Sequence, residues 1–172
     1  MVYRIPAVNL VGRGCLAQLK DEIGTLGCKK ALVVSDKFLT ENGVVEKVTK
    51  VLDQVGIEHT LYNDVKQNPS VANVEGGLEV LKKENCDFIV SIGGGSPQDC
   101  GKAISVLATN GGKITDYEGV NKSQKKCLPI VAIATTAGTS AEVTINYVIT
   151  DEETHIKMIM VDRNTLASIT VN

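Results

Sequence analysis

Three consecutive glycines followed by a serine, at positions 93–96, form the part of the sequence best suited to chemistry. Each glycine costs backbone entropy on folding, so a run of three requires a reason. One reason is a tight turn between a strand and a helix. The other is a bare backbone whose N–H groups, together with a helix N-terminus, receive an anion such as phosphate. Ser96 is a good helix cap, Pro97 suits the first helical position, and Asp99 completes a pattern similar to a capping box. We therefore expect a helix that begins just after the glycines and a phosphate-binding loop before it.

This loop differs from the common Rossmann fingerprint. Gln98 stands where G-x-G-x-x-G requires its last glycine. The acid that could bind a ribose, Asp36, precedes the glycines, whereas a Rossmann fold has it about 20 residues after them. Asp36 follows an apolar run, and a carboxylate at the carboxyl end of a strand can accept hydrogen bonds from two ribose hydroxyls and repel a 2′-phosphate. A helix cap before Phe38 is an equally good interpretation of Asp36.

Small and hydroxyl-bearing residues form a second candidate segment, at positions 135–141. Such a segment can approach a cofactor closely and donate hydrogen bonds, although a segment of this kind is more often only a loop. Asn68, which precedes a proline, reads by itself as a turn residue. Lys102 and Lys157 are expected, from the usual behaviour of lysines, to lie in solvent.

Residues for metal or acid–base chemistry are few. The two histidines, His59 and His155, are far apart in the sequence and form no H-x-x-H or H-x-x-x-H pair. We therefore expect no catalytic residue and no metal ligand in this chain. The cysteines are odd in number and form no C-x-x-C pair, which favours free thiols in a reducing compartment, the cytoplasm; they are Cys15, Cys28, Cys86, Cys100 and Cys127.

The composition is that of an ordinary globular domain, with 43% hydrophobic and 22% charged residues, and we expect residues 1–172 to form one domain. A net charge of −2 and an aromatic content of 3% argue against a nucleic-acid partner. The sequence contains no apolar run near the ~20 residues that a membrane helix needs and no visible signal peptide, so we expect no membrane partner.

Strand-like and helix-like segments alternate along the chain. This order predicts parallel strands with right-handed crossovers and helices on both faces, an α/β fold. A polar turn at 151–154 between two strand-like segments predicts a β-hairpin near the end. The expected strands are 9–12, 31–35, 57–62, 87–92, 129–134, 143–149 and 156–161, and the expected helices follow residue 15 and cover 44–55, 71–85 and 97–108.

Taken together, residues 92–99 with Lys102, and residues 135–139 followed by 141–144, resemble the iron-containing (group III) alcohol dehydrogenases. Residues 142–153 are especially similar to the lactaldehyde reductase branch of that family. The resemblance spans the chain and implies a dehydroquinate-synthase-like protein. In such a protein a Rossmann-like NAD-binding domain precedes a helical domain, which holds Fe²⁺ through one Asp and three His. The helical domain and its metal ligands would lie beyond this chain.

The resemblance also implies a role for individual residues. Asp36 corresponds to the acid that binds the adenosine ribose and favours NAD over NADP, and Asp99 to an acid near the cofactor. The pyrophosphate loop corresponds to Gly94, Gly95 and Ser96, the second cofactor-binding segment to Thr135, Thr136, Thr139 and Thr144, and further contacts to Asn68, Asn146 and Lys157. The sequence departs from the family where Ser140 replaces a usual glycine and Arg163 a usual proline.

For the complete enzyme the resemblance implies hydride transfer between NAD(H) and a small alcohol, diol or aldehyde, with Fe²⁺ as the Lewis acid that stabilises the developing alkoxide. We expect this chain alone to bind NAD(H) without catalysing the reaction. We also expect an apolar face where the helical domain would dock, which favours self-association such as a homodimer. The alternatives are a free-standing nucleotide-binding module with a regulatory or structural role, and a relative of glycerol dehydrogenase.

Overall fold

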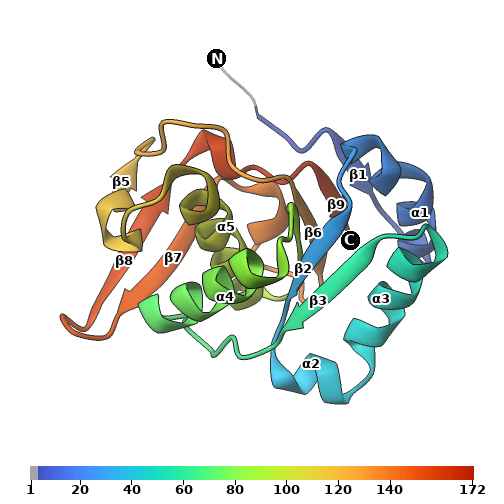
Figure 1. Cartoon of the computed structure of the whole chain (residues 1–172), viewed down its shortest axis with the longest axis horizontal. Helices are drawn as coiled ribbons and strands as arrows, with labels where there is room; N and C mark the ends of the chain where they lie inside the picture. Colours follow the sequence, from blue (N-terminus) through green and yellow to red (C-terminus); the bar gives the residue numbers. More distant parts are fainter. Residues whose placement is uncertain (1–3) are drawn as a thin grey trace.

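The computed structural model describes residues 4–172, and its centre is a six-stranded sheet in the order β1-β9-β6-β4-β2-β3 (Figure 1). Every pair of neighbouring strands in it is parallel, which confirms the expected α/β fold. The strands are β1 (Val8–Leu10), β2 (Lys30–Val34), β3 (Glu58–Tyr62), β4 (Phe88–Gly93), β6 (Ile130–Ala134) and β9 (Ile169–Val171).

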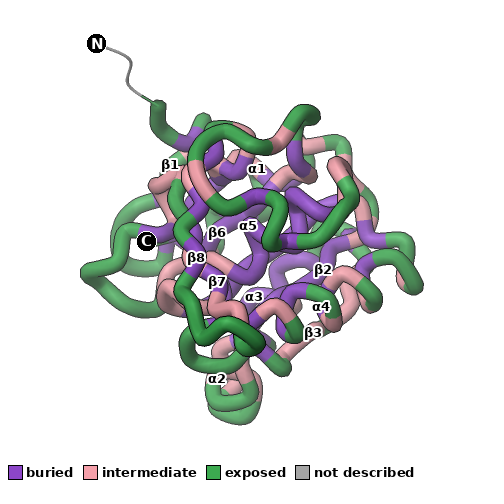
Figure 2. The backbone as a smooth tube through the Cα atoms, turned by 90° about the vertical axis from the view of Figure 1, so that its left-hand side faces the viewer, coloured by how far each residue is buried: buried purple, intermediate pink, exposed green. Residues whose placement is uncertain are grey.

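Helices cover both faces of this sheet, because the central strands are apolar on both sides. In β2, Ala31 and Val33 pack with the α3 face, whereas Leu32 and Val34 pack with the α4 and α5 face. Figure 2 shows the buried backbone concentrated in the central strands and in α5. The helices are α1 (Leu19–Glu22) between two 3-10 turns, α2 (Lys37–Glu41), α3 (Val44–Gln54), α4 (Val71–Glu84) and α5 (Gly95–Asn110).

The start of α5 differs from the prediction. The helix begins at Gly95 and its N-cap is Gly94, so the prediction that Ser96 caps the helix is wrong. Glycine has no Cβ and lets the helix start directly after β4, and Pro97 is tolerated in the first turn because the N–H it lacks would have no partner within the helix. The predicted capping-box role of Asp99 is also wrong, since its carboxylate accepts a hydrogen bond from the backbone N–H of Val148 at 3.0 Å.

A second sheet of three strands packs on the outer side of α5 (Figure 1). Its antiparallel pair, β7 (Asn146–Asp151) and β8 (Ile156–Val161), is the predicted hairpin, and β5 (Gly119–Val120) pairs with β8 in parallel. The hairpin buries alternate residues in the same core as α4 and α5, namely Tyr147, Ile149, Met158 and Met160. Helix α5 therefore lies between two sheets and is buried on almost all sides.

Candidate functional site

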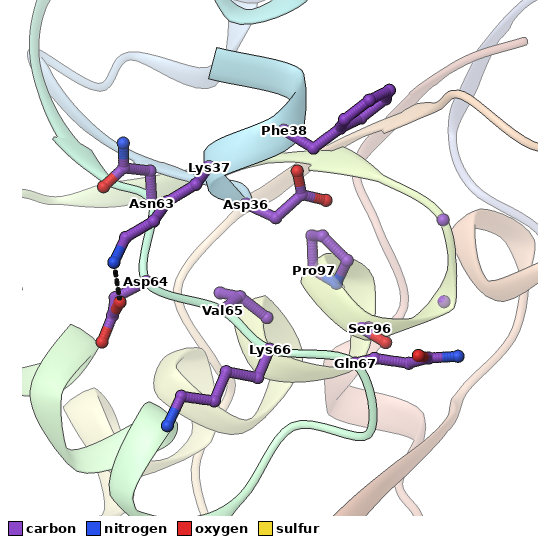
Figure 3. A pocket seen from close by; sticks show the side chains of 12 residues that line it. Asp36, Lys37, Phe38, Asn63, Asp64, Val65, Lys66, Gln67, Ser96 and Pro97 are labelled. Atoms are coloured by element: carbon purple, nitrogen blue, oxygen red, sulfur yellow. Dashed lines mark ion pairs between the residues drawn. The ribbon is translucent and has the colours of Figure 1, made fainter. Parts of the chain in front are cut away.

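A groove of about 500 Å³ opens at the carboxyl ends of β2, β3 and β4 (Figure 3). Its walls come from the loops that follow these strands, at residues 36–38, 63–67 and 94–97. After β2 the chain crosses to α3 on one face of the sheet, and after β4 it crosses to α5 on the other face. The boundary between β2 and β4 is therefore a topological switch point, which is where open α/β sheets bind their ligands.

The glycine loop presents bare backbone to this groove. A Cβ on Gly94 would lie 2.9 Å from Thr136 Oγ1, and a Cβ on Gly95 would lie 3.5 Å from Thr139 Cγ2. The structure thus brings together the glycine loop and the threonine segment, which lie far apart in the sequence. Gly93 adopts φ +150°, and a Cβ there would meet Pro97 Cγ at 2.5 Å, so only glycine fits. The loop runs directly into α5, whose first N–H groups have no acceptor within the helix, and a helix N-terminus of this kind is the arrangement that binds phosphate.

Asp36 lines the same groove and also caps a helix. Its Oδ1 accepts a hydrogen bond of 2.8 Å from the backbone N–H of Leu39, so the helix-cap interpretation is confirmed. The side chain is half-buried and lies on the wall opposite the loop at Val65 and Gln67 (Figure 3). The carboxylate can therefore cap α2 and still face a ligand in the groove.

An ion pair at the rim joins two of the three loops. Lys37 Nζ lies 3.0 Å from Asp64 Oδ1, and both side chains are more than half exposed (Figure 3). Surface pairs of this kind contribute at most about 1 kcal/mol to stability. Its effect is to link the loop after β2 to the loop after β3 beside Asp36.

A smaller pocket of about 220 Å³ lies on the other side of Gly95. Because Gly95 lines both hollows, the first turn of α5 separates them. The wall of this second pocket carries predicted site residues together with Ala141, Tyr147 and Val148; the predicted ones are Gly95, Asp99, Thr139, Thr144 and Asn146. Thr135 and Thr136 line a third hollow of about 450 Å³, next to Asn172.

Asp99, which is half-buried, and Lys102, which is buried, lie one turn apart on α5 and are the charged side chains of this helix. Burial raises the pKa of Asp99 to about 6, although Lys102 and the Val148 N–H oppose that shift. The Lys102 side chain is 1% exposed, so the prediction of a solvent lysine is wrong. Burial lowers the pKa of Lys102 to about 8, against the opposing effect of Asp99 and Glu142. The hairpin covers this face of α5, and that long-range packing puts the lysine inside.

Asn68 and Lys157 contact each other and lie outside all three hollows. Lys157 Nζ donates a hydrogen bond of 2.9 Å to Asn68 Oδ1, and both residues are exposed. Asn68 has φ +56°, as a turn residue would. The pair borders the first groove only through the neighbouring Gln67, which lines it. The structure therefore does not bring these two predicted residues to the glycine loop.

Within residues 4–172, His, Cys, Asp and Glu side chains form no group of three or more that could hold a metal ion. His59 lies in β3 and His155 in the hairpin turn, so the two imidazoles belong to different sheets. The described residues therefore do not fit an iron site. No helix in this part of the chain is long and apolar enough to span a membrane.

A parallel sheet with a glycine loop and a helix N-terminus at its switch point defines a Rossmann-like nucleotide-binding domain. The model of the iron-containing alcohol dehydrogenase family matches residues 6–172, and the chain belongs to that family.

Three examples show how similar the chain is to other proteins. It is 51% identical over 170 residues to alcohol dehydrogenase 4 of Schizosaccharomyces pombe, covering 99% of this chain and 40% of the relative. It is 44% identical over 160 residues to lactaldehyde reductase of Escherichia coli K12, covering 92% of this chain and 42% of that protein. The crystal structure of sulfoacetaldehyde reductase from Bifidobacterium kashiwanohense in complex with NAD⁺ superposes with a TM-score of 0.88 at 31% identity. The match covers 99% of this chain and 45% of that protein. The chain thus spans less than half the length of these relatives.

Proposed function

We propose that this chain is the NAD(H)-binding part of an iron-dependent alcohol dehydrogenase, which interconverts short-chain alcohols or diols and aldehydes by hydride transfer. The observation that carries the proposal is the groove at the switch point, where Gly94 and Gly95 expose bare backbone beside the N-terminus of α5. A similar structure that contains NAD⁺ supports the cofactor. The similarity to a lactaldehyde reductase supports a small aldehyde or diol as substrate.

The cofactor would extend from the first groove across the glycine loop into the second pocket. Asp36 would accept hydrogen bonds from the adenosine ribose, and the backbone N–H groups of Gly94, Gly95 and Ser96 would bind the pyrophosphate. The nicotinamide half would enter the second pocket past Gly95, where Thr139, Thr144, Asn146 and Asp99 line the wall, with Thr135 and Thr136 beside it. The Asn68–Lys157 pair would contribute from the rim.

The metal would be held by other residues. Since residues 4–172 contain no group of His, Cys, Asp and Glu that could hold it, we place the Fe²⁺ ligands in a helical domain outside these 172 residues. When bound, Fe²⁺ supplies a Lewis acid for the alcohol oxygen. The part of the reaction that this chain performs is to bind NAD(H), to orient its nicotinamide and to recognise its ribose. We therefore expect this chain to bind NADH without oxidising an alcohol.

Titration of the purified chain with NADH, followed by the fluorescence of the nicotinamide, tests this proposal. Saturable binding at one site is expected, with a Gly94→Ala variant binding more weakly. A folded chain that shows no saturable binding would overturn it. Steady, iron-dependent oxidation of propane-1,2-diol by the same chain would contradict the assignment of the metal ligands to another domain.

We also propose that the protein works in the cytoplasm as a homodimer, without nucleic acid or membrane as partner. The five cysteines are free thiols, most of them buried, as suits a reducing compartment. Apolar side chains such as Val11 and Phe38 are 72% and 70% exposed and could be covered by a second copy. Sedimentation equilibrium would test the dimer, and a monomer throughout the micromolar range would contradict it.

A further inference from the structure

Helix α5 holds the start of the hairpin with two side chains that are one helical turn apart. The chain turns at residues 141–146, which we call the 141–146 turn. It includes a 3-10 helix (Ala141–Val143) and the first residue of β7. Lys102 Nζ donates hydrogen bonds of 2.7 Å to the carbonyl oxygens of Ala141 and Asn146, the two ends of this turn. It also lies 3.5 Å from Thr144 Oγ1. Asp99 holds β7 just beyond the turn by accepting a hydrogen bond of 3.0 Å from the backbone N–H of Val148.

These contacts connect α5 to the wall of the second pocket. Thr144 and Asn146, from the 141–146 turn, line that pocket opposite Gly95 and Asp99 of α5. The distance between the turn and the helix therefore sets the depth of the pocket. Lys102 fixes that distance through hydrogen bonds to main-chain carbonyls, and these two hydrogen bonds do not depend on which side chains the turn carries.

An ammonium group is a costly way to join a helix to a turn if stability is the only requirement. Burying a charged group is expensive, and apolar side chains of similar volume often stabilise a core equally well or better. What Lys102 provides is a fixed geometry, because its charge-assisted hydrogen bonds are short and about twice as strong as neutral ones. This geometry suits a group that positions a polar wall.

We propose that Lys102 is a positioning residue, which holds the 141–146 turn against α5 and thereby shapes the pocket that receives the nicotinamide half of the cofactor. The inference rests on the proposed binding of NAD(H). It makes a prediction of its own: loss of the Lys102 contacts should weaken ligands that reach the second pocket and spare ligands that occupy only the first groove. NADH reaches both, whereas ADP is confined to the groove at Asp36 and the glycine loop.

The first test compares NADH and ADP binding to the Lys102→Met variant. Methionine is also unbranched and fills space well, but it has no N–H donor. We expect NADH to bind about tenfold more weakly, the equivalent of losing one good charge-assisted hydrogen bond, and ADP to bind within about twofold of the wild type. Lys102→Arg, which keeps the charge and the donors, should retain more NADH affinity than Lys102→Met.

Ser105→Ala is the matched control. Ser105 lies on the same helix, is fully buried, and donates a hydrogen bond of 2.9 Å to the carbonyl of Leu128, outside all the residues that line the second pocket. This variant loses the buried hydrogen bond between Ser105 and the Leu128 carbonyl but keeps the contacts between Lys102 and the 141–146 turn. It should lower the melting temperature and leave the ratio of NADH to ADP affinity unchanged.

A pH series on the wild-type chain gives a second measurement, which does not depend on any variant folding. Burial lowers the pKa of Lys102 to about 8. The charged groups that face it are Asp99 on α5 and Glu142 on the 3-10 helix. Cys100 on α5 and Tyr147 on β7 also titrate, but burial raises the pKa of both, which keeps them neutral in this range. Above pH 8 the amine loses its charge and one donor, so NADH affinity should fall about threefold from pH 7.5 to 9.5 while ADP affinity stays constant.

Stability should move in the opposite direction over this range. The pKa of Lys102 in the folded chain is below its ordinary value of 10.5, so the unfolded chain binds more protons between about pH 8 and 10.5. The contribution of Lys102 to stability therefore rises with pH in that window. If Lys102 had only a structural role, the NADH affinity of the folded chain would not fall over this range, because stability rises there.

The outcomes separate this inference from the proposed function. Wild-type chain that is folded and binds neither NADH nor ADP would overturn the proposed function. If the wild type binds both, equal NADH affinity in Lys102→Met, or an equal loss of NADH and ADP, would overturn the role of Lys102. If Lys102→Met does not fold, the pH series decides: a constant ratio of NADH to ADP affinity contradicts the inference, and a falling ratio supports it.

Discussion

Two substitutions of Asp36 should separate the roles that the structure combines in one carboxylate. Asp36 caps α2 through Leu39 N–H and lines the groove where we place the adenosine ribose. Asn at this position can still accept the cap hydrogen bond but carries no charge, whereas Ala does neither. Comparison of Asp36→Asn with Asp36→Ala therefore distinguishes a loss of helix capping from a loss of ligand recognition.

The loss of the helix cap and the loss of ligand recognition differ in size, and they are measured differently, the first by the melting temperature and the second by cofactor affinity. Replacing an N-cap Asp by Ala costs about 1 kcal/mol, whereas Asn caps about as well as Asp. For a chain of this length, a change of 1 kcal/mol lowers the melting temperature by about 2–4 °C. A unit charge on a 2′-phosphate ~4 Å from the carboxylate would be repelled by about 1 kcal/mol in water and about 4 kcal/mol near a protein surface. Since Asp36 is half-buried, we take about 2 kcal/mol, which corresponds to about 30-fold discrimination against NADPH.

The assay is a titration of wild type and both variants with NADH and NADPH, alongside thermal melts. Asp36→Asn should keep the wild-type melting temperature, bind NADH more weakly, and raise the ratio of NADPH to NADH affinity about 30-fold. Asp36→Ala should change the same ratio and also melt 2–4 °C lower. An unchanged ratio in Asp36→Asn would refute the ribose assignment, and equal melting temperatures for Asp36→Ala and wild type would refute the energetic role of the cap.

Three further predictions concern the glycine loop, the acid Asp99 and the thiols. Gly94→Ala would place a methyl group 2.9 Å from Thr136 Oγ1 and should weaken NADH binding about tenfold in the titration, whereas in Gly24→Ala the new Cβ meets nothing within 4 Å and binding should be unchanged. Burial raises the pKa of Asp99 from 3.8 to about 6, so the stability that its protonated form contributes is lost as pH rises through 6. In thermal melts, the melting temperature of Asp99→Asn should therefore rise relative to that of the wild type above pH 6, and this gain should disappear below pH 4. A difference in melting temperature that does not change with pH would contradict this. Of the five thiols only Cys28 is not buried, so it should react with Ellman's reagent faster than the other four in the folded chain, although burial and Asp87 raise its pKa and slow it. An equally fast reaction of a second thiol would contradict the packing.

The sequence predicts the two central strands β2 and β4 because their burial is visible locally. Residues 31–34 and 88–90 are uninterrupted apolar runs, because these central strands are covered on both faces. The sequence does not predict β5 and β9, which are two and three residues long. Strand β9 exists because it pairs with β1 and β6, which lie far from it in the sequence. No local pattern of three residues carries that information.

The same distinction applies to the candidate site. The glycine loop, Asp36 and the threonine segment all follow apolar strands, so their convergence at one edge of the sheet follows from the predicted topology. Lys102 was missed because the hairpin that buries it comes about 40 residues later. One signal is present in the sequence: Asp99 and Lys102 are the only charged residues in α5, and a helix with so few charges is more often buried than exposed. Charges inside such a helix must face polar partners within the protein.

The position of α5 between the two sheets explains how one helix can serve both halves of the site. Its N-terminus faces the first groove, Gly95 lines the groove and the second pocket together, and Asp99 and Lys102 hold the wall of the second pocket. A shift of α5 along its axis would move the proposed phosphate site and the proposed nicotinamide wall in the same direction. Packing on both faces opposes such a shift, because moving the helix would open cavities against two layers at once. The proposed cofactor site is therefore built on the most deeply buried helix among residues 4–172, and the buried Lys102 belongs to the support of that helix.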